Sequence, residues 1–234
     1  MSDLPAAPPP IPYWRTGLRN IIRLAIIFGA MFLVAGRADY WQGWVLTGIV
    51  LVYSVVSAIA FRTKADLVSE RMRPGPGVKW WDRIYYALHL PLIFIMFFLA
   101  ALDGGRFHWS PPLPGWAYAV AIVLLVIGLW LISWAMWTNR FFSTMVRIQT
   151  DRGHHVVRQG PYRFVRHPGY LSGPPMLIGM CLLLGSLWAL IPAAIDLAIL
   201  VVRTYLEDTT LQRELPGYAE YAREVRYRLV PGVW

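Results

Sequence analysis

The chain has 234 residues, of which 57% are hydrophobic and only 15% are charged, whereas soluble domains have about 25% charged residues. A soluble globule of this size cannot bury so much apolar surface, so the composition excludes a soluble enzyme and also a disordered chain. The formal charge of +9 would suggest nucleic acid in a soluble protein. Here the basic residues lie between apolar runs, so we expect membrane lipids, and no nucleic acid, as partners.

Residues 1–14 are rich in proline and are expected to form a flexible N-terminal arm. A membrane-spanning helix needs about 20 apolar residues, and such runs follow at residues 18–36, 41–61, 85–102 and 116–138. A longer run, residues 170–206, is interrupted at Gly185-Ser186. This break predicts a helical hairpin with arms at residues 170–184 and 187–206. The expected fold is all-α: a polytopic membrane helical bundle with five to six crossings and a C-terminal hairpin.

The basic residues predict the orientation of these helices. Twenty of the 22 Lys and Arg residues fall on one side of the predicted spans, and only Arg37 and Arg106 fall on the other. The positive-inside rule makes the basic side cytoplasmic. Both termini are therefore expected in the cytoplasm, which requires an even number of crossings and favours six.

The segment at residues 139–169 is too long and too rich in aromatic, His and Gly-Pro elements for a simple connector. Pro168 keeps His167 out of the helical conformation, so the hairpin helix starts after it. The unpaired N–H groups at a helix start suit an anionic ligand group, but a basic aromatic membrane anchor explains the pattern equally well. After Pro216-Gly217, Tyr218 and Tyr221 begin an apolar spacing that predicts a short amphipathic helix.

Arg203 and Glu207 lie four residues apart, which places them on one helix face. They form either a functional pair or a snorkelling arginine with a surface ion pair. Asp196 is either functional or paired within the bundle, and His89 is either a haem or substrate ligand or hydrogen-bonded within the bundle. Cys181 is expected to be a small buried hydrophobic residue. No residues have the spacing of a metal site, so no metal is expected.

Together these motifs resemble the isoprenylcysteine carboxyl methyltransferase family of integral-membrane methyltransferases. The resemblance covers residues 139–234. It is carried by four groups of residues: the His154-His155-Val156-Val157 step and the Gly160–Tyr162 turn; the Arg166-His167-Pro168-Gly169-Tyr170 core; Arg203 with Glu207; and the closing Tyr218, Tyr221, Val225, Tyr227-Arg228 and Pro231 pattern. The chain has Glu207-Asp208 where the family commonly has consecutive glutamates.

The resemblance implies S-adenosylmethionine as the cofactor, bound between the cytoplasmic loop and the tail. Carried over by position, the cofactor-binding residues are Gln149, His154, His155, Val156, Val157, Tyr162, His167, Pro168, Gly169, Tyr170 and Glu207. Arg203 is the catalytic residue and faces the acceptor.

The expected function is therefore transfer of a methyl group, in the membrane, to a lipophilic or small acceptor, with a carboxylate or thiol favoured. A lipophilic acceptor would enter a groove between the hairpin and the third span. The expected organisation is a four-helix membrane region at residues 15–138 and a catalytic region at residues 139–234, with the active site on the cytoplasmic face. The alternatives are a sterol-type membrane reductase that uses NADPH and a non-enzymatic membrane protein.

Overall fold

The computed structural model describes residues 13–234, with side chains from residue 19 onward, and this part of the chain contains helices and loops but no strand. The α-helices are α1 (Tyr13–Ala35), α2 (Trp41–Ala60), α3 (Ala65–Met72), α4 (Trp80–Ala100), α5 (Gly115–Thr138), α6 (Gly173–Leu183), α7 (Leu190–Glu214) and α8 (Tyr218–Glu224). A π-helical segment, Ala101–Phe107, extends α4. Residues 1–12 of the expected N-terminal arm lie outside the described residues, and α1 begins at Tyr13. The predicted all-α class is confirmed.

Three helical segments within the described residues are long and apolar enough to cross a membrane: Trp41–Thr63, Trp80–Phe107 and Gly115–Thr138. Large apolar side chains point outward from them, including Val52 and Trp116, which are 65% and 69% exposed. Such faces are stable when lipid covers them. These findings agree with the predicted helical membrane bundle, while the number of five to six crossings stays a prediction.

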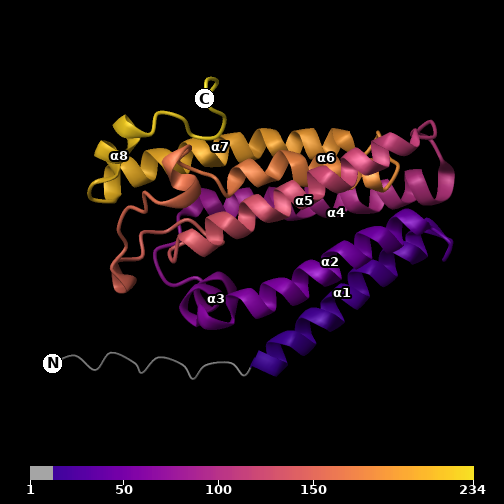
Figure 1. The fold of residues 1–234 in the computed structure, drawn as a ribbon, viewed down its shortest axis with the longest axis horizontal. Helices are drawn as coiled ribbons and strands as arrows, with labels where there is room; N and C mark the ends of the chain where they lie inside the picture. The colour runs from indigo at the N-terminus through magenta and orange to yellow at the C-terminus, as the bar shows by residue number, and fades with distance from the viewer. Residues whose placement is uncertain (1–12) are drawn as a thin grey trace.

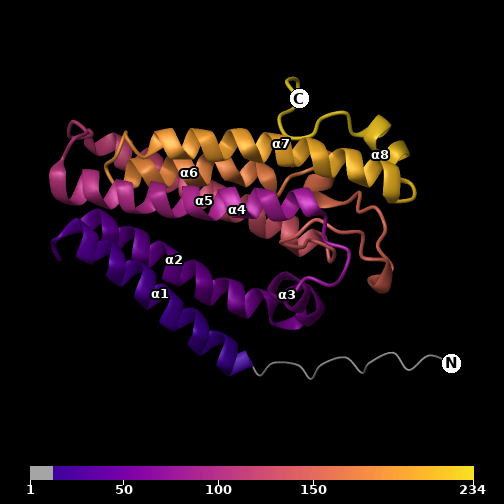
Figure 2. The same cartoon turned by 180° about the vertical axis from the view of Figure 1, so that it is seen from behind.

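Helices α4, α5, α6 and α7 run alongside one another as a bundle, and the α1–α2 pair diverges from this bundle toward the end that carries α3 (Figures 1 and 2). The closest helix pairs are α5 with α6 and α4 with α7. Gly179 makes the first contact possible, because a Cβ atom there would lie 2.8 Å from the Ala121 carbonyl oxygen. Small residues allow such close backbone approach between membrane helices.

The C-terminal hairpin forms as the sequence predicts, with a turn at Gly185, whose φ of +73° favours glycine. Pro174 and Pro175 lie in the first turn of α6, where a missing N–H costs nothing. With 11 residues, α6 is only about 16 Å long, too short to cross the bilayer alone. Cys181 of α6 is fully buried in the hydrophobic core, as expected.

A buried carboxyl group ties the hairpin turn to the π-helical segment. Asp103 is fully buried, and its Oδ2 accepts hydrogen bonds from Ser110 Oγ at 2.5 Å and Ser186 Oγ at 2.6 Å. The α6–α7 turn is therefore fixed at one end of the molecule. The opposite end gathers α3, the loop at residues 139–169 and α8 (Figure 1), so segments far apart in sequence meet there.

Candidate active site

The loop at residues 139–169 has little regular structure, yet buried polar contacts hold it in place. The buried Arg147 donates two hydrogen bonds of 2.8 Å to Glu70 of α3 and a further one of 2.7 Å to Asp151. Burial disfavours the charge of Glu70, but the Arg147 guanidinium outweighs this and lowers the pKa of that carboxyl. Gln149, 1% exposed, donates a 2.7 Å bond to the Phe141 carbonyl. The loop is thereby docked against α3.

Asp208 connects the turn before α6 to the C-terminal tail. It is fully buried and accepts bonds from Arg166 at 2.7 and 2.9 Å, from Arg228 at 2.9 Å and from Tyr218 at 3.2 Å. His167 Nε2 lies 3.2 Å from the same carboxylate. Burial opposes the charge, but the His167 and Arg166 contacts outweigh it and hold the pKa of Asp208 well below its usual range.

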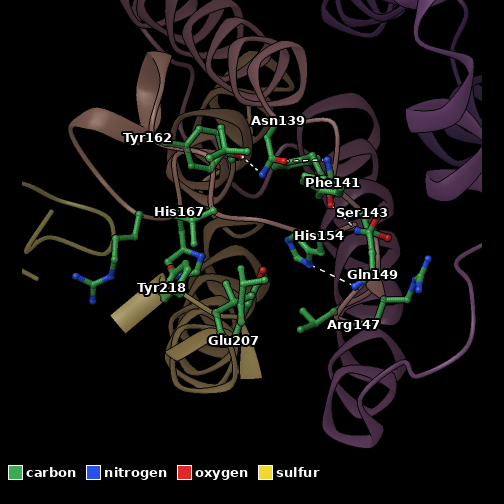
Figure 3. Close-up of a pocket in the computed structure, with 18 of the residues that line it drawn as sticks. Asn139, Phe141, Ser143, Arg147, Gln149, His154, Tyr162, His167, Glu207 and Tyr218 are labelled. Atoms are coloured by element: carbon green, nitrogen blue, oxygen red, sulfur yellow. Dashed lines mark hydrogen bonds between the residues drawn. The ribbon is translucent and has the colours of Figure 1, made fainter. Parts of the chain in front are cut away.

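A pocket opens between the loop, α7 and α8 (Figure 3). Ten of the eleven predicted cofactor-binding residues line it: Gln149, His154, His155, Val156, Val157, Tyr162, His167, Gly169, Tyr170 and Glu207. The eleventh, Pro168, is buried behind this wall and is not among the lining residues. The structure therefore brings together residues that are up to 58 positions apart, Gln149 to Glu207, in one place.

Tyr170 and His167 give this pocket a flat aromatic wall. Their rings stack with centroids 5.7 Å apart and an interplanar angle of 5°, and the Tyr170 hydroxyl donates a hydrogen bond to the Glu207 carboxylate. Opposite them, His154 packs against Phe141, with ring centroids 4.7 Å apart. The backbone N–H of Gln149 donates to His154 Nδ1 at 3.3 Å, and burial lowers the pKa of His154 to about 4. His154 is therefore neutral at neutral pH.

The chemistry of this lining fits a nucleoside ligand that carries a positive charge. Aromatic faces suit a heteroaromatic ring, and the half-buried Glu207 carboxylate suits a sulfonium or ammonium group. The free space between the side chains is only about 90 Å³, whereas ligand pockets usually have about 300–1,000 Å³. A ligand of nucleoside size therefore requires the loop to move outward.

A second, mostly apolar cavity of about 380 Å³ lies deeper in the helix bundle. Its lining comes from α4, α6 and α7, between which the sequence predicts a groove, and also from α2, α3, α5 and the loop at residues 139–169. Four residues line both spaces: Phe142, Ser143, Gly169 and Tyr170. A Cβ atom on Gly169 would lie 2.3 Å from Phe142, so only glycine allows this dividing wall to be so thin.

Arg203 lines the second cavity and is absent from the lining of the first. Its Nε donates to Asp82 of α4 at 2.8 Å, and its Nη2 donates to the Thr144 carbonyl at 2.7 Å. Its guanidinium carbon lies 5.0 Å from the centre of the Tyr170 ring. No ion pair joins Arg203 to Glu207 within the described residues, and Arg203 is only 6% exposed. The interpretation as an exposed surface ion pair is therefore wrong.

Comparison with known proteins identifies a related family. Residues 116–216 match the family model of phospholipid methyltransferases. Over these residues the chain resembles the integral-membrane methyltransferases. Because the phospholipid methyltransferase family is part of the same group as the isoprenylcysteine carboxyl methyltransferases, the resemblance inferred from the sequence is confirmed. A search of curated proteins found no match.

The matched segment runs from α5 through α7, so it contains the whole loop, the hairpin, Arg203 and Glu207. It supports membrane methyltransferase activity as the function class. Within residues 13–234, no group of three or more His, Cys, Asp or Glu side chains is arranged to hold a metal ion.

Several residues of this candidate site are missing from the sequence prediction. Asp82 could have been identified from the sequence, because an acidic residue in the first turn of a membrane helix needs a partner. Tyr218 lies in the quoted tail pattern and lines the first pocket. No sequence pattern marks Phe142, because its place in the wall between the two cavities depends on the fold alone. His89 Nδ1 lies 2.7 Å from Asp196 Oδ1, so both residues are hydrogen-bonded within the bundle, and both line the second cavity.

Proposed function

We propose that the chain is an S-adenosylmethionine-dependent methyltransferase that methylates a lipophilic acceptor in the membrane. The observation that carries this proposal is the pair of cavities that meet at Tyr170. One is lined by aromatic, polar and carboxylate groups and lies at the end of the bundle, and the other is apolar and contains Arg203. A water-soluble donor and a lipophilic acceptor need separate routes to one point of contact, and this arrangement provides them.

The donor supplies an already activated methyl group on a sulfonium, so the protein has mainly to position the two reactants in line. Glu207 and the Tyr170–His167 stack would hold the donor and favour its positive charge. Arg203 would orient the acceptor from the other side of the wall with its planar guanidinium. Arg203 Nε and Nη2 donate to Asp82 and to the Thr144 carbonyl, so Nη1 would be the nitrogen that contacts the acceptor.

The acceptor has two candidate chemistries. Arg203 favours a carboxylate, or a thiol next to one, because a guanidinium N–H forms a strong charge-assisted hydrogen bond with a carboxylate oxygen. The name of the matched family favours a phospholipid. The active site would lie on the cytoplasmic face, because the loop, α8 and most basic residues belong to the same side of the predicted spans. A sterol-type reductase would bind NADPH in place of the donor, and the methyltransferase match argues against it.

The test separates the roles of Arg203 and Glu207 on one helix. Calorimetry on purified protein without added metal should detect binding of S-adenosylhomocysteine and none of NADPH. Glu207→Gln should weaken that binding. Arg203→Lys keeps a positive charge beside the buried Asp82 but loses the planar fork, so turnover should fall on the order of 100-fold with donor affinity unchanged.

Turnover is best measured with labelled donor and two acceptors in mixed micelles, palmitate and phosphatidylethanolamine. His167→Ala should weaken donor binding without moving the acceptor KM. Equal mild losses in the Arg203 and Glu207 variants would contradict the separate roles, and NADPH binding without S-adenosylhomocysteine binding would refute the function.

A further inference from the structure

Arg71 faces the same cavity as Arg203, although it comes from a different part of the chain. It lies in the last turn of α3 and lines the apolar cavity. Its guanidinium carbon stands 5.1 Å from the centre of the Phe142 ring, which belongs to the wall between the two cavities. Thr144 Oγ1 donates a 3.0 Å hydrogen bond to the Arg71 carbonyl, so the backbone that carries this side chain is anchored to the loop.

Arg71 differs from the buried arginines in having no acidic partner. Arg147, Arg166 and Arg203 each form an ion pair with a buried carboxylate, at 2.7 to 2.8 Å. No ion pair or side-chain hydrogen bond of Arg71 is found in the described part of the chain. The neighbouring acid, Glu70, is occupied by Arg147 through both of its oxygens.

No carboxylate compensates the charge of Arg71 where it stands in the described structure. Burial lowers the pKa of Arg71, and repulsion from Arg203 acts in the same direction. Asp82 already compensates Arg203, and the one acidic residue that lines the cavity, Asp196, is hydrogen-bonded to His89. The cavity therefore has a surplus of positive charge at its loop end, and an anion there would gain strong charge-assisted hydrogen bonds.

We propose that Arg71 binds an oxyanion of the acceptor, a carboxylate or a phosphate, and so selects anionic lipids over neutral ones. This inference rests on the proposed function, since it assigns the apolar cavity to the acceptor. The hydrocarbon part of the acceptor lies along the apolar lining, for example Ile49, Leu129 and Met180. Arg71 thereby fixes how deep the head of the acceptor lies relative to Tyr170.

Three brominated lipids test this site by quenching tryptophan fluorescence in detergent: dibromostearate as the carboxylate, a dibromo-phosphatidate as the phosphate, and dibromostearyl alcohol as the neutral control. Arg71→Gln should weaken binding of one or both anions about 10- to 100-fold, the loss of one hydrogen bond to a charged group. The alcohol should bind as before, and Arg71→Lys should recover part of the loss. Arg73→Gln, at an exposed position outside this cavity, should bind all three lipids like the wild type.

The affinity for S-adenosylhomocysteine, measured on the same samples, keeps the two proposals apart. Arg71 lies outside the first pocket, so donor affinity should not change in its variants. If Arg71→Gln is not folded, Arg71→Met replaces it, because a methionine preserves the packing of the stem.

Wild-type protein that binds no S-adenosylhomocysteine would overturn the proposed function, while an Arg71-dependent anion affinity would still support this site. Unchanged affinity for both anions in a folded Arg71 variant would overturn the inference. If only one of the two anions loses affinity, that anion identifies the acceptor head group.

Discussion

Asp208→Asn is expected to destabilise the whole active-site end of the molecule. The asparagine has the size of aspartate but no charge, and it replaces one acceptor oxygen with an NH2 donor, although Arg166 and Arg228 can only donate. Arg166, whose side chain is 4% exposed, would then carry a buried charge without a counter-charge. His167 and Tyr218, which contact Asp208, also line the pocket that we propose for the donor. Donor affinity should therefore fall together with stability.

The size of the effect follows from the burial of the pair. Removing one partner of a buried ion pair costs about 3–5 kcal/mol, and Asp208 binds two arginines, of which Arg228 is 24% exposed. We therefore expect a loss of about 3–5 kcal/mol in the free energy of unfolding, a large part of the roughly 5–15 kcal/mol that proteins have.

Reversible unfolding of the purified protein in mixed micelles measures this loss, with S-adenosylhomocysteine affinity as the second readout. The matched control is Glu224→Gln, which removes the acid of the exposed Arg158–Glu224 pair, with side chains 44% and 60% exposed. That change should cost no more than about 1 kcal/mol. If Asp208→Asn is as mild as its control, Asp208 does not hold this end of the molecule together.

Two further predictions concern pH and orientation. Burial lowers the pKa of His154 to about 4, below the usual 6.5, so its neutral form favours folding. The wild type should therefore lose about 1–3 kcal/mol of stability relative to His154→Gln as the pH falls from 6.5 to 4, with part of the shift discounted for exposure. Parallel stability curves would contradict this. Reporter fusions at Arg106 should read outside and at Arg152 inside, and a cytoplasmic signal from Arg106 would reverse the topology.

The sequence predicted the elements of the fold because their signals are local. Apolar runs of about 20 residues predicted helices where α2, α4 and α5 lie, to within a few residues. The break at Gly185 predicted the hairpin, and the spacing after Pro216-Gly217 predicted α8. The family resemblance selected ten residues that line one pocket, since the motif reports which short segments meet even when the path between them is irregular.

The partners of the charged residues depend on the tertiary structure. Spacing alone placed Arg203 and Glu207 on one face of α7, which left a surface ion pair between them as one alternative to separate roles. Packing of α4 against α7 gives Arg203 the carboxylate of Asp82, 121 positions away, and the turn before α6 gives Glu207 the hydroxyl of Tyr170. The two residues therefore serve different cavities.

The sequence by itself determined that this chain forms membrane helices with a patterned loop, a hairpin and a tail at one end. Only the tertiary structure decided which acids compensate which arginines, and that Arg71 is left without one. The physical reason is the distance along the chain over which each interaction acts. Hydrophobic periodicity and turn chemistry act over a few residues, whereas a buried charge is stabilised by whichever group the folded chain brings within hydrogen-bond distance.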